Sequence, residues 1–264
     1  QSITNMVASY LPTLPGMPPI STTDNDFAFQ LELKRTDWLQ LLFGIPLQID
    51  NPLLLSGFIN DKQKNVSIMG SCPDFTYKEG RYTQAALHIG TTSDTLRCAV
   101  DVIKHMDNDV PFALSLRAGA ADNKINASLN WDNHDEQRMS GTLNTDSHFF
   151  LSPDGKQTGV ISVLPSQIVL RNADWQIESA EIVYAKNNLS VNHFTVKHGQ
   201  QHIIIDGKVS DNADDCLTAD IVDVDVEYIL DLVNFHSVDF GGSASGTATV
   251  SSLFTEPQAS AHLK

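Results

Sequence analysis

Three histidines are the residues whose type and spacing come nearest to a metal site. His193, His198 and His202 lie within the segment VNHFTVKHGQQH. Residues five positions apart on a β-strand point to opposite faces of the sheet, and a glycine turn separates His198 from His202. Zinc could be held only across the hairpin, so ordinary strand and turn positions are the favoured interpretation.

A second group of potential ligands is the acidic segment SDNADD, residues 210–215. Its composition is similar to that of a calcium loop, but it lacks the glycine and the distal glutamate that such loops use. Asp and Asn are also the residues that turns prefer, so we predict a turn here. Asp223 and Asp225 are expected on one face of a strand, where two carboxylates repel and do not form a glycosidase pair.

Charge and motif content narrow the classes of function further. The chain contains no GxSxG, HExxH, P-loop or GxGxxG motif, and its formal net charge is −15 over 264 residues. A chain this acidic repels phosphate backbones, which excludes nucleic acid as a partner. We therefore expect a protein that is not an enzyme and that uses no metal or cofactor.

The three cysteines do not form a disulfide framework. Cys72, Cys98 and Cys216 are odd in number and widely spaced. One bridge could form, but buried thiols that act as small apolar side chains are favoured.

The elements that would position any site are predicted to be β-strands. Residues 27–33 (FAFQLEL) alternate apolar and polar side chains, and KINASLNW places Ile125, Ala127, Leu129 and Trp131 on one face. Turn signals recur after roughly 8–12 residues, which is typical of all-β proteins. The fold class we predict is all-β, an elongated and curled antiparallel or mixed sheet with one or two short helices.

The domain organisation is predicted from proline content and from the change of period. Residues 1–26 form a lead-in segment, with a short helix over residues 3–11 that prolines then interrupt. Residues 27–264 form the β region. Asp37 can cap a second short helix that Gly44 ends. A further helix is expected over residues 226–235.

Two distant stretches of the β region share one order of features. LELKRTDWLQLLFGIPLQIDNPLLLSGFIN and IVDVDVEYILDLVNFHSVDFGGSASGTATV each contain a strand, a short helix that opens with an aromatic residue, a link and a Ser-Gly strand. Pro73 and Pro257 follow the two Ser-Gly strands. We predict a structural repeat whose unit spans about 27–225, with a second copy that begins at about 221.

The closing segment, GGSASGTATVSSLFTEPQASAHL, resembles the repeat tails of TamB and AsmA-like proteins. The shared features are two glycines, an alternating Thr/Val strand, a proline and another alternating strand. They fall at Gly242, Gly246, Thr247, Thr249, Val250, Pro257 and Leu263. The front half (LELKRTDWLQLLFGIPL, LLLSGFIND, SIMGSCPDFTY) resembles repeat units of the large TamB-like proteins of the Bacteroidetes, so the resemblance extends from about residue 27 onward.

The resemblance implies a large periplasmic protein that is anchored in the inner membrane by a segment outside this sequence. Its sheet would curl into a taco-like groove that transfers lipid between the inner and outer membranes and supports outer-membrane biogenesis. The partners implied are a phospholipid or another acyl-chain lipid and, through the parent protein, an outer-membrane barrel of the Omp85 type.

Lipid tails require apolar area and no fixed constellation of residues, so the apolar face of the strands becomes the candidate site. The candidate lining residues are Ile125, Leu129, Met139, Leu143, Ile203, Ile205 and Val209. Ordinary core positions are the alternative for all seven. The candidate groove-plug residues are Trp38 and Leu41 on the helix that follows Asp37, and Tyr228 and Leu232 on the helix over residues 226–235. Simple packing onto the sheet is the alternative for all four.

Two other classes of function compete with lipid transfer. A secreted β-sandwich module that binds glycans or acts in adhesion would expose coplanar Trp or Tyr side chains, and the chain has only three Trp residues, all in amphipathic settings. An enzyme on a β scaffold is the third hypothesis, although no residues nominate its site.

Overall fold

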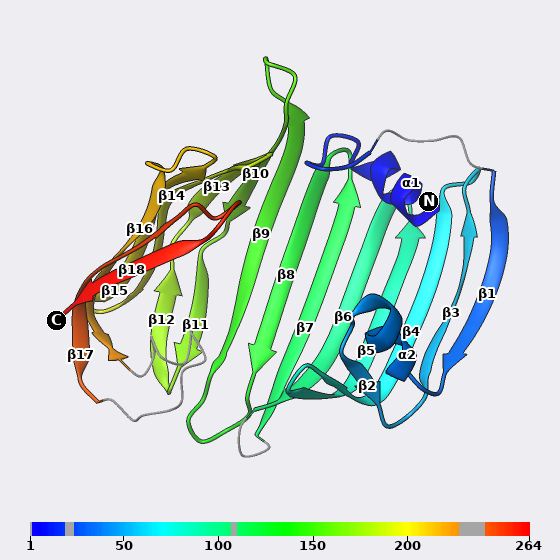
Figure 1. The fold of residues 1–264 in the computed structure, drawn as a ribbon, viewed down its shortest axis with the longest axis horizontal. Coiled ribbons are helices and arrows are strands. Elements are labelled where there is room, and N and C mark those ends of the chain that lie inside the picture. Colours follow the sequence, from blue (N-terminus) through cyan, green and yellow to red (C-terminus); the bar gives the residue numbers. More distant parts are fainter. Residues whose placement is uncertain (1, 19–23, 107–109, 227–240) are drawn as a thin grey trace. The chain divides into compact units, whose positions relative to one another are not determined.

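The computed structural model describes residues 2–18, 24–106, 110–226 and 241–264 (Figure 1). Across these ranges the chain forms 18 strands and two short helices, and the strand pairs are antiparallel. This confirms the predicted all-β class with one or two short helices. The chain divides into two compact units, Gln1–Leu143 and Asn144–Lys264, and each is described by itself.

Unit 1 is an antiparallel meander with two short helices, one before its first strand and one after it. Its elements are α1 (Ser2–Tyr10), β1 (Asp26–Leu33), α2 (Asp37–Phe43), β2 (Leu47–Ile49), β3 (Leu53–Asn60), β4 (Asn65–Tyr77), β5 (Gly80–Thr92), β6 (Thr95–His105), β7 (Pro111–Ala121) and β8 (Lys124–Asp132). β1 pairs with β3, and from β3 to β8 each strand pairs with the next along the chain. β2 pairs with the far end of β4, in line with β3.

Tight turns set the register of these hairpins. Ser93 and Asp94 join β5 to β6, Asp122 and Asn123 join β7 to β8, and all four have positive φ angles between 48° and 61°. Two consecutive residues with positive φ match the right-handed twist of paired strands, and Asp and Asn tolerate this region best.

The register separates the side chains of unit 1 into two faces. Cross-strand partners share a face, so the pairs Leu31–Leu55, Leu87–Val100 and Leu116–Leu129 belong to one surface. We call this surface the unit-1 apolar face. Its apolar members are Phe27, Phe29, Leu31, Leu33, Leu53, Leu55, Gly57, Ile59, Val66, Ile68, Gly70, Cys72, Leu87, Ile89, Leu96, Cys98, Val100, Val102, Leu114, Leu116, Ala118, Ala120, Ile125, Ala127, Leu129 and Trp131. Thr91, which pairs with Leu96, and Lys104, which follows Val102 by two positions, lie on the same face.

Strand β9 (Ser140–Leu151) begins in unit 1 and continues into unit 2. The other strands of unit 2 are β10 (Gln157–Val163), β11 (Ser166–Leu170), β12 (Ala173–Ile177), β13 (Ala180–Ala185), β14 (Asn188–His198), β15 (Gln201–Ser210), β16 (Cys216–Asp225), β17 (Ser243–Ser251) and β18 (Gln258–Leu263). β10 and β13 pair side by side, as do β11 and β12, and from β13 onward each strand pairs with the next.

The apolar face of unit 2 is a packed core. Trp175, Val209, Ile221 and Val224 lie on this face and are buried, and Val209 and Val224 have no exposed surface. Because these residues come from β12, β15 and β16, the strands on both sides of β14 contribute to one core.

Three β-bulges interrupt the ladders, and each contains a residue other than glycine with positive φ. Gln84 lies in the bulge between β5 and β6, His193 in that between β14 and β15, and Asp223 in that between β16 and β17. A bulge shifts which side chains share a face. The bulge therefore separates Asp223 from Asp225, which corrects the expectation that their carboxylates share a regular strand face.

The two predicted copies of the repeat share a local contact. β1 pairs with β3 in the first copy, and β16 pairs with β17 in the second. A Cβ atom on Gly57 would lie 2.3 Å from the Ser67 carbonyl oxygen, and one on Gly246 would lie 2.0 Å from that of His262. In both copies the Ser-Gly glycine is therefore the point at which the next strand approaches most closely.

Two of the three predicted helices lie within the described residues. The helix expected over residues 3–11 is α1, and the helix expected after Asp37 is α2, which ends at Gly44 in a left-handed conformation. Its N-cap is Thr36 and not Asp37, which lies in the first turn. The third helix, over residues 226–235, lies almost entirely outside the described residues. Neither α1 nor α2 has the length and hydrophobicity that a membrane-spanning helix needs.

We expect Gly57→Ala to lower the free energy of unfolding by about 1–3 kcal/mol, because the new methyl group would overlap the backbone of β4. Gly119→Ala is the matched control, since its Cβ would meet only Thr95 Cγ2 at 3.5 Å. Urea unfolding of both variants measures the difference. Equal stability of the two variants would contradict the close approach.

Candidate functional site

The unit-1 apolar face is a mostly apolar surface that seven of the described strands build together. The register also places Thr91 and Lys104 on it, and its other members carry no charge and no hydrogen-bonding side chain beyond the two thiols and the Trp131 indole. Phe27 and Leu31 on β1 are exposed, and the members on β6 and on β8 are half-buried. A surface of this kind exposes apolar area and offers few polar groups that would orient a reaction.

Helix α1 covers one end of this face. Met6, Tyr10 and Leu11 are buried with Ile59 and Val66, at the end where β3 turns into β4. The Tyr10 hydroxyl donates to the Lys64 carbonyl at 3.3 Å, and the Tyr10 carbonyl accepts the Asn123 N–H at 2.9 Å. α1 is thus fixed to the turns at one end of the strands (Figure 1). Farther along the strands, the members of the face on β6 and β8 that α1 does not reach are half-buried.

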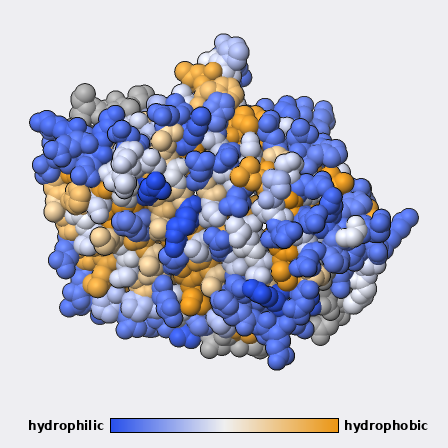
Figure 2. Space-filling view, turned by 180° about the vertical axis from the view of Figure 1, so that it is seen from behind, coloured by the Kyte–Doolittle hydropathy of each residue, from blue (hydrophilic) through white to orange (hydrophobic). Residues whose placement is uncertain are grey.

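The opposite face of unit 1 is polar and is held by side-chain pairs. Arg117 donates to both carboxylate oxygens of Asp101, at 2.8 and 2.9 Å, across β6 and β7. Burial raises the pKa of Asp101, but hydrogen bonds from Arg117 and Ser115 outweigh it and leave that pKa below the usual range. Figure 2 looks at this side and shows mostly hydrophilic residues with scattered hydrophobic patches.

The predicted lining residues of unit 1 are distributed over two strands and a loop. Ile125 and Leu129 lie on the unit-1 apolar face, on β8, and are half-buried. Thr142 donates to Asn130 on the polar face at 2.6 Å, so alternation places Leu143 on the apolar side. Met139 lies in the loop before β9, where its N–H is held by the Asn133 side chain.

The three lining candidates of unit 2 differ in burial. Ile203 and Ile205 are half-buried on β15. Val209 has no exposed surface, so it belongs to the core of unit 2 and not to an open lining. This is a correction to its predicted role, and its physical reason is the packing of β15 among the neighbouring strands.

Two of the four groove-plug candidates, Trp38 and Leu41, lie on α2. Trp38 is 42% exposed and Leu41 is 82% exposed, and α2 buries none of its residues. Neither side chain is enclosed by the sheet of unit 1. Tyr228 and Leu232 lie outside the described residues.

The three cysteines are free thiols. Cys72 is buried and Cys98 half-buried on the unit-1 apolar face, whereas Cys216 is exposed at the start of β16. Burial raises the pKa of both Cys72 and Cys98. The two thiols therefore stay protonated and act as apolar side chains.

The residues weighed for metal binding have structural partners. His193 lies in a bulge, where its ring Nδ1 is 2.7 Å from Asp206 Oδ2, and His198 Nδ1 is 2.6 Å from the Asp174 carbonyl. In the acidic turn, Asp215 accepts hydrogen bonds from Ser210 and pairs with Lys208. Within the described ranges, no cluster of three or more His, Cys, Asp or Glu side chains could hold a metal ion.

Sequence reasoning missed most of the unit-1 apolar face. Val100, Leu116 and Leu87 lie at its middle, and the alternation in β5 and β6 is less regular than in β8, because Ala86, Ala99 and Ile103 fall on the opposite face. The signal that could have found them is cross-strand register, because the hairpin turn between β7 and β8 fixes which apolar residues face each other.

Comparison of the chain with protein-family models, with curated proteins and with solved structures finds no match.

Thiol labelling tests how deeply each of the three cysteines is buried. We expect Cys216 to react first with a thiol reagent such as DTNB, Cys98 more slowly and Cys72 slowest, because exposure falls and the thiol pKa is raised in the last two. Cys216→Ser should remove the fast phase alone. A fast phase that survives in Cys216→Ser would contradict the burial of the other two thiols.

Proposed function

We propose that this chain is a non-enzymatic lipid-handling segment of a TamB/AsmA-like envelope protein. The unit-1 apolar face holds the acyl chains of a phospholipid or a similar lipid. In this proposal the segment works in the periplasm, on the path between the inner and outer membranes, and serves outer-membrane biogenesis.

The observation that carries the proposal is the composition of the unit-1 apolar face. Most residues that the register places on it are apolar, from Phe27 on β1 to Trp131 on β8, with Thr91 on β5 and Lys104 on β6 as polar exceptions, and many of them remain half-buried. A soluble protein rarely leaves contiguous apolar area exposed unless the area binds something. Acyl chains suit such a surface because they need area and no particular hydrogen bonds.

The energetics of a lipid tail favour exchange over tight capture. Each buried methylene contributes about 0.8 kcal/mol relative to water, so a 16-carbon tail gains on the order of 10 kcal/mol. A bilayer offers the same tail a similar gain. A lipid therefore moves between a bilayer and an apolar protein face with little net change in free energy, which is what transfer requires.

The local repeat supports the resemblance to TamB and AsmA-like proteins. The Ser-Gly strands β3 and β17 each pair with the strand that precedes them in the repeat, and each approaches the next strand at its glycine. A unit that recurs in this way can extend a sheet without closing it.

The test is lipid retention after expression in a Gram-negative host. We expect phospholipid to co-purify with the wild-type chain and to be detected by native mass spectrometry. Leu129→Asp, which puts a carboxylate on the apolar face, should lose at least tenfold of the bound lipid, because a charge among acyl chains is strongly unfavourable.

The matched control is Asn126→Asp on the same strand. Asn126 lies on the polar face and is exposed, so the same charge there should leave lipid binding unchanged. Far-ultraviolet circular dichroism checks that both variants keep the sheet. Wild-type chain that carries no phospholipid, or equal loss in the two variants, would count against the proposal.

A further inference from the structure

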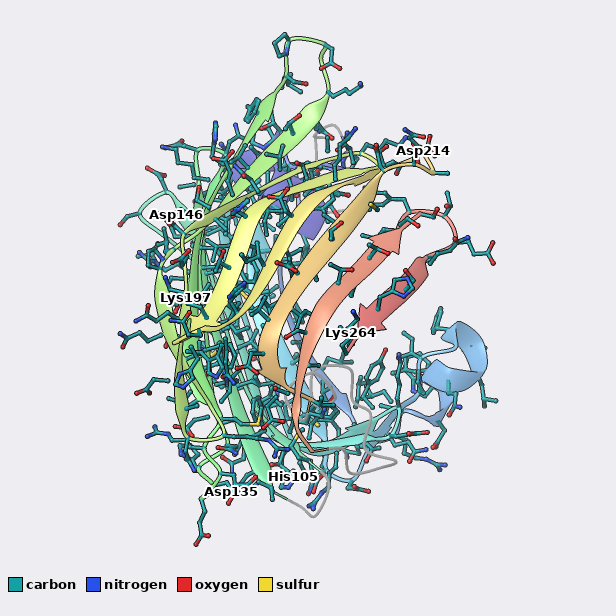
Figure 3. The ribbon with its side chains drawn as sticks, turned by 90° about the vertical axis from the view of Figure 1, so that its left-hand side faces the viewer. His105, Asp135, Asp146, Lys197, Asp214 and Lys264 are labelled. Atoms are coloured by element: carbon teal, nitrogen blue, oxygen red, sulfur yellow. The ribbon has the colours of Figure 1, made fainter. Side chains whose placement is uncertain are left out.

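Helix α2 and the residues beside it form an exposed apolar projection on unit 1. We call residues 36–47 the α2 finger. Leu41 is 82% exposed, Leu42 71% and Phe43 65%. In Figure 3 the helix stands away from the strands of unit 1, at the right of the view.

The base of the α2 finger is closed by a buried contact. Thr36, which is 2% exposed, donates its hydroxyl to the Leu47 carbonyl at 2.6 Å, so the two ends of the finger are tied together. β2 then pairs with β4 and connects the finger to the sheet. The exposure of the apolar side chains therefore belongs to an anchored element and not to a loose strand end.

The distribution of the exposed side chains indicates what surrounds them. Successive residues of a helix are about 100° apart, so Leu41, Leu42 and Phe43 cover more than half of the circumference. A groove on a protein binds a helix through a stripe of residues at i, i+3 and i+4, and the opposite side of the helix stays in water. A helix that is apolar around most of its circumference requires an apolar medium on several sides.

The residues at the start of the finger suit a membrane–water interface. The Trp38 indole N–H donates to the Arg35 carbonyl at 3.1 Å, and its ring meets Phe43 edge-on at 6.2 Å between centroids. Trp is the residue type that interfaces favour, because it combines an apolar ring with a polar N–H. The seven residues of α2 are about 10 Å long, which fits the depth of the headgroup region and does not span a bilayer.

Charge beside the finger points to a zwitterionic surface. Lys34 pairs with Glu32 at 3.6 Å and Arg35 pairs with Asp37 at 2.9 Å, so the four charged groups cancel locally. The chain as a whole carries a net charge of −15, which repels an anionic membrane. Zwitterionic headgroups avoid this repulsion.

We infer that the α2 finger docks the protein on phospholipid bilayers by inserting Leu41, Leu42 and Phe43 into the interfacial region of a zwitterionic leaflet. The docking goes beyond the binding of lipid on the unit-1 apolar face. Only its use in lipid transfer rests on the proposed function.

Vesicle binding tests the inference. With phosphatidylcholine vesicles we expect the chain to co-sediment and its tryptophan emission to shift to shorter wavelength. The emission is read in a Trp131→Phe background, because Trp131 lies on the unit-1 apolar face. There Trp38→Phe should remove the shift, since Trp175 is buried. Phosphatidylglycerol vesicles should bind less at low salt, and added salt should reduce the difference.

The variant Leu41→Gln with Leu42→Gln should weaken binding to phosphatidylcholine by at least about tenfold. Gln keeps good helix propensity, and both positions lack buried contacts, so the fold should be preserved. Met69→Gln is the matched control, since Met69 is 58% exposed on β4 of the same unit and should bind vesicles as the wild type does.

The two proposals fail separately. The double Gln variant should keep co-purified phospholipid while it loses vesicle binding, and Leu129→Asp should show the reverse. Full vesicle binding by the double Gln variant overturns the docking role. It is equally overturned if the wild type ignores vesicles and instead forms a dimer that the Gln substitutions dissociate, because a second copy is then the occupant.

Discussion

The period of two along each strand, combined with hairpin turns that fix the register, is the constraint on which the described structure depends. Because cross-strand partners share a face, the apolar residues of seven strands in unit 1 add up to one surface. A slip of one residue in any hairpin would move all the apolar side chains of that strand to the opposite face. The turns at Ser93-Asp94 and Asp122-Asn123 prevent this with backbone angles that few other residues adopt as readily.

The two units satisfy the need to hide apolar area in different ways. In unit 2 the apolar side chains pack into a core in which Trp175, Val209 and Val224 are almost or fully buried. In unit 1 the end beneath α1 and the middle of β4, at Ile68 and Cys72, are buried, and the members on β6 and β8 stay half-buried. The proposed lipid-binding role therefore belongs to unit 1, and the candidates on β15 have a weaker claim to it.

Sequence reasoning could predict what depends on local pattern. The alternation of β8, the turn at Asp122-Asn123 and the end of α2 at Gly44 all follow from residue types at fixed spacing. The bulge at Asp223 could not be predicted, because it depends on how β16 pairs with a strand that follows 18 residues later. The burial of Val209 and the exposure of Leu41 could not be predicted from the sequence either, because both depend on which strands and helices lie nearby.

The repeat connects these features to a common physical cause. Gly57 and Gly246 allow the next strand to approach to a distance that a Cβ atom would prevent, and each follows a serine in its strand. In the first copy the strand that contains Gly57 is separated from β1 by α2, which returns to the sheet through Thr36 and Leu47. The sheet carries this insertion without losing its register, because β1 and β3 pair without interruption from Asp26–Asn60 to Leu33–Leu53. The α2 finger can therefore stay exposed while β1, β3 and β4 beside it remain paired.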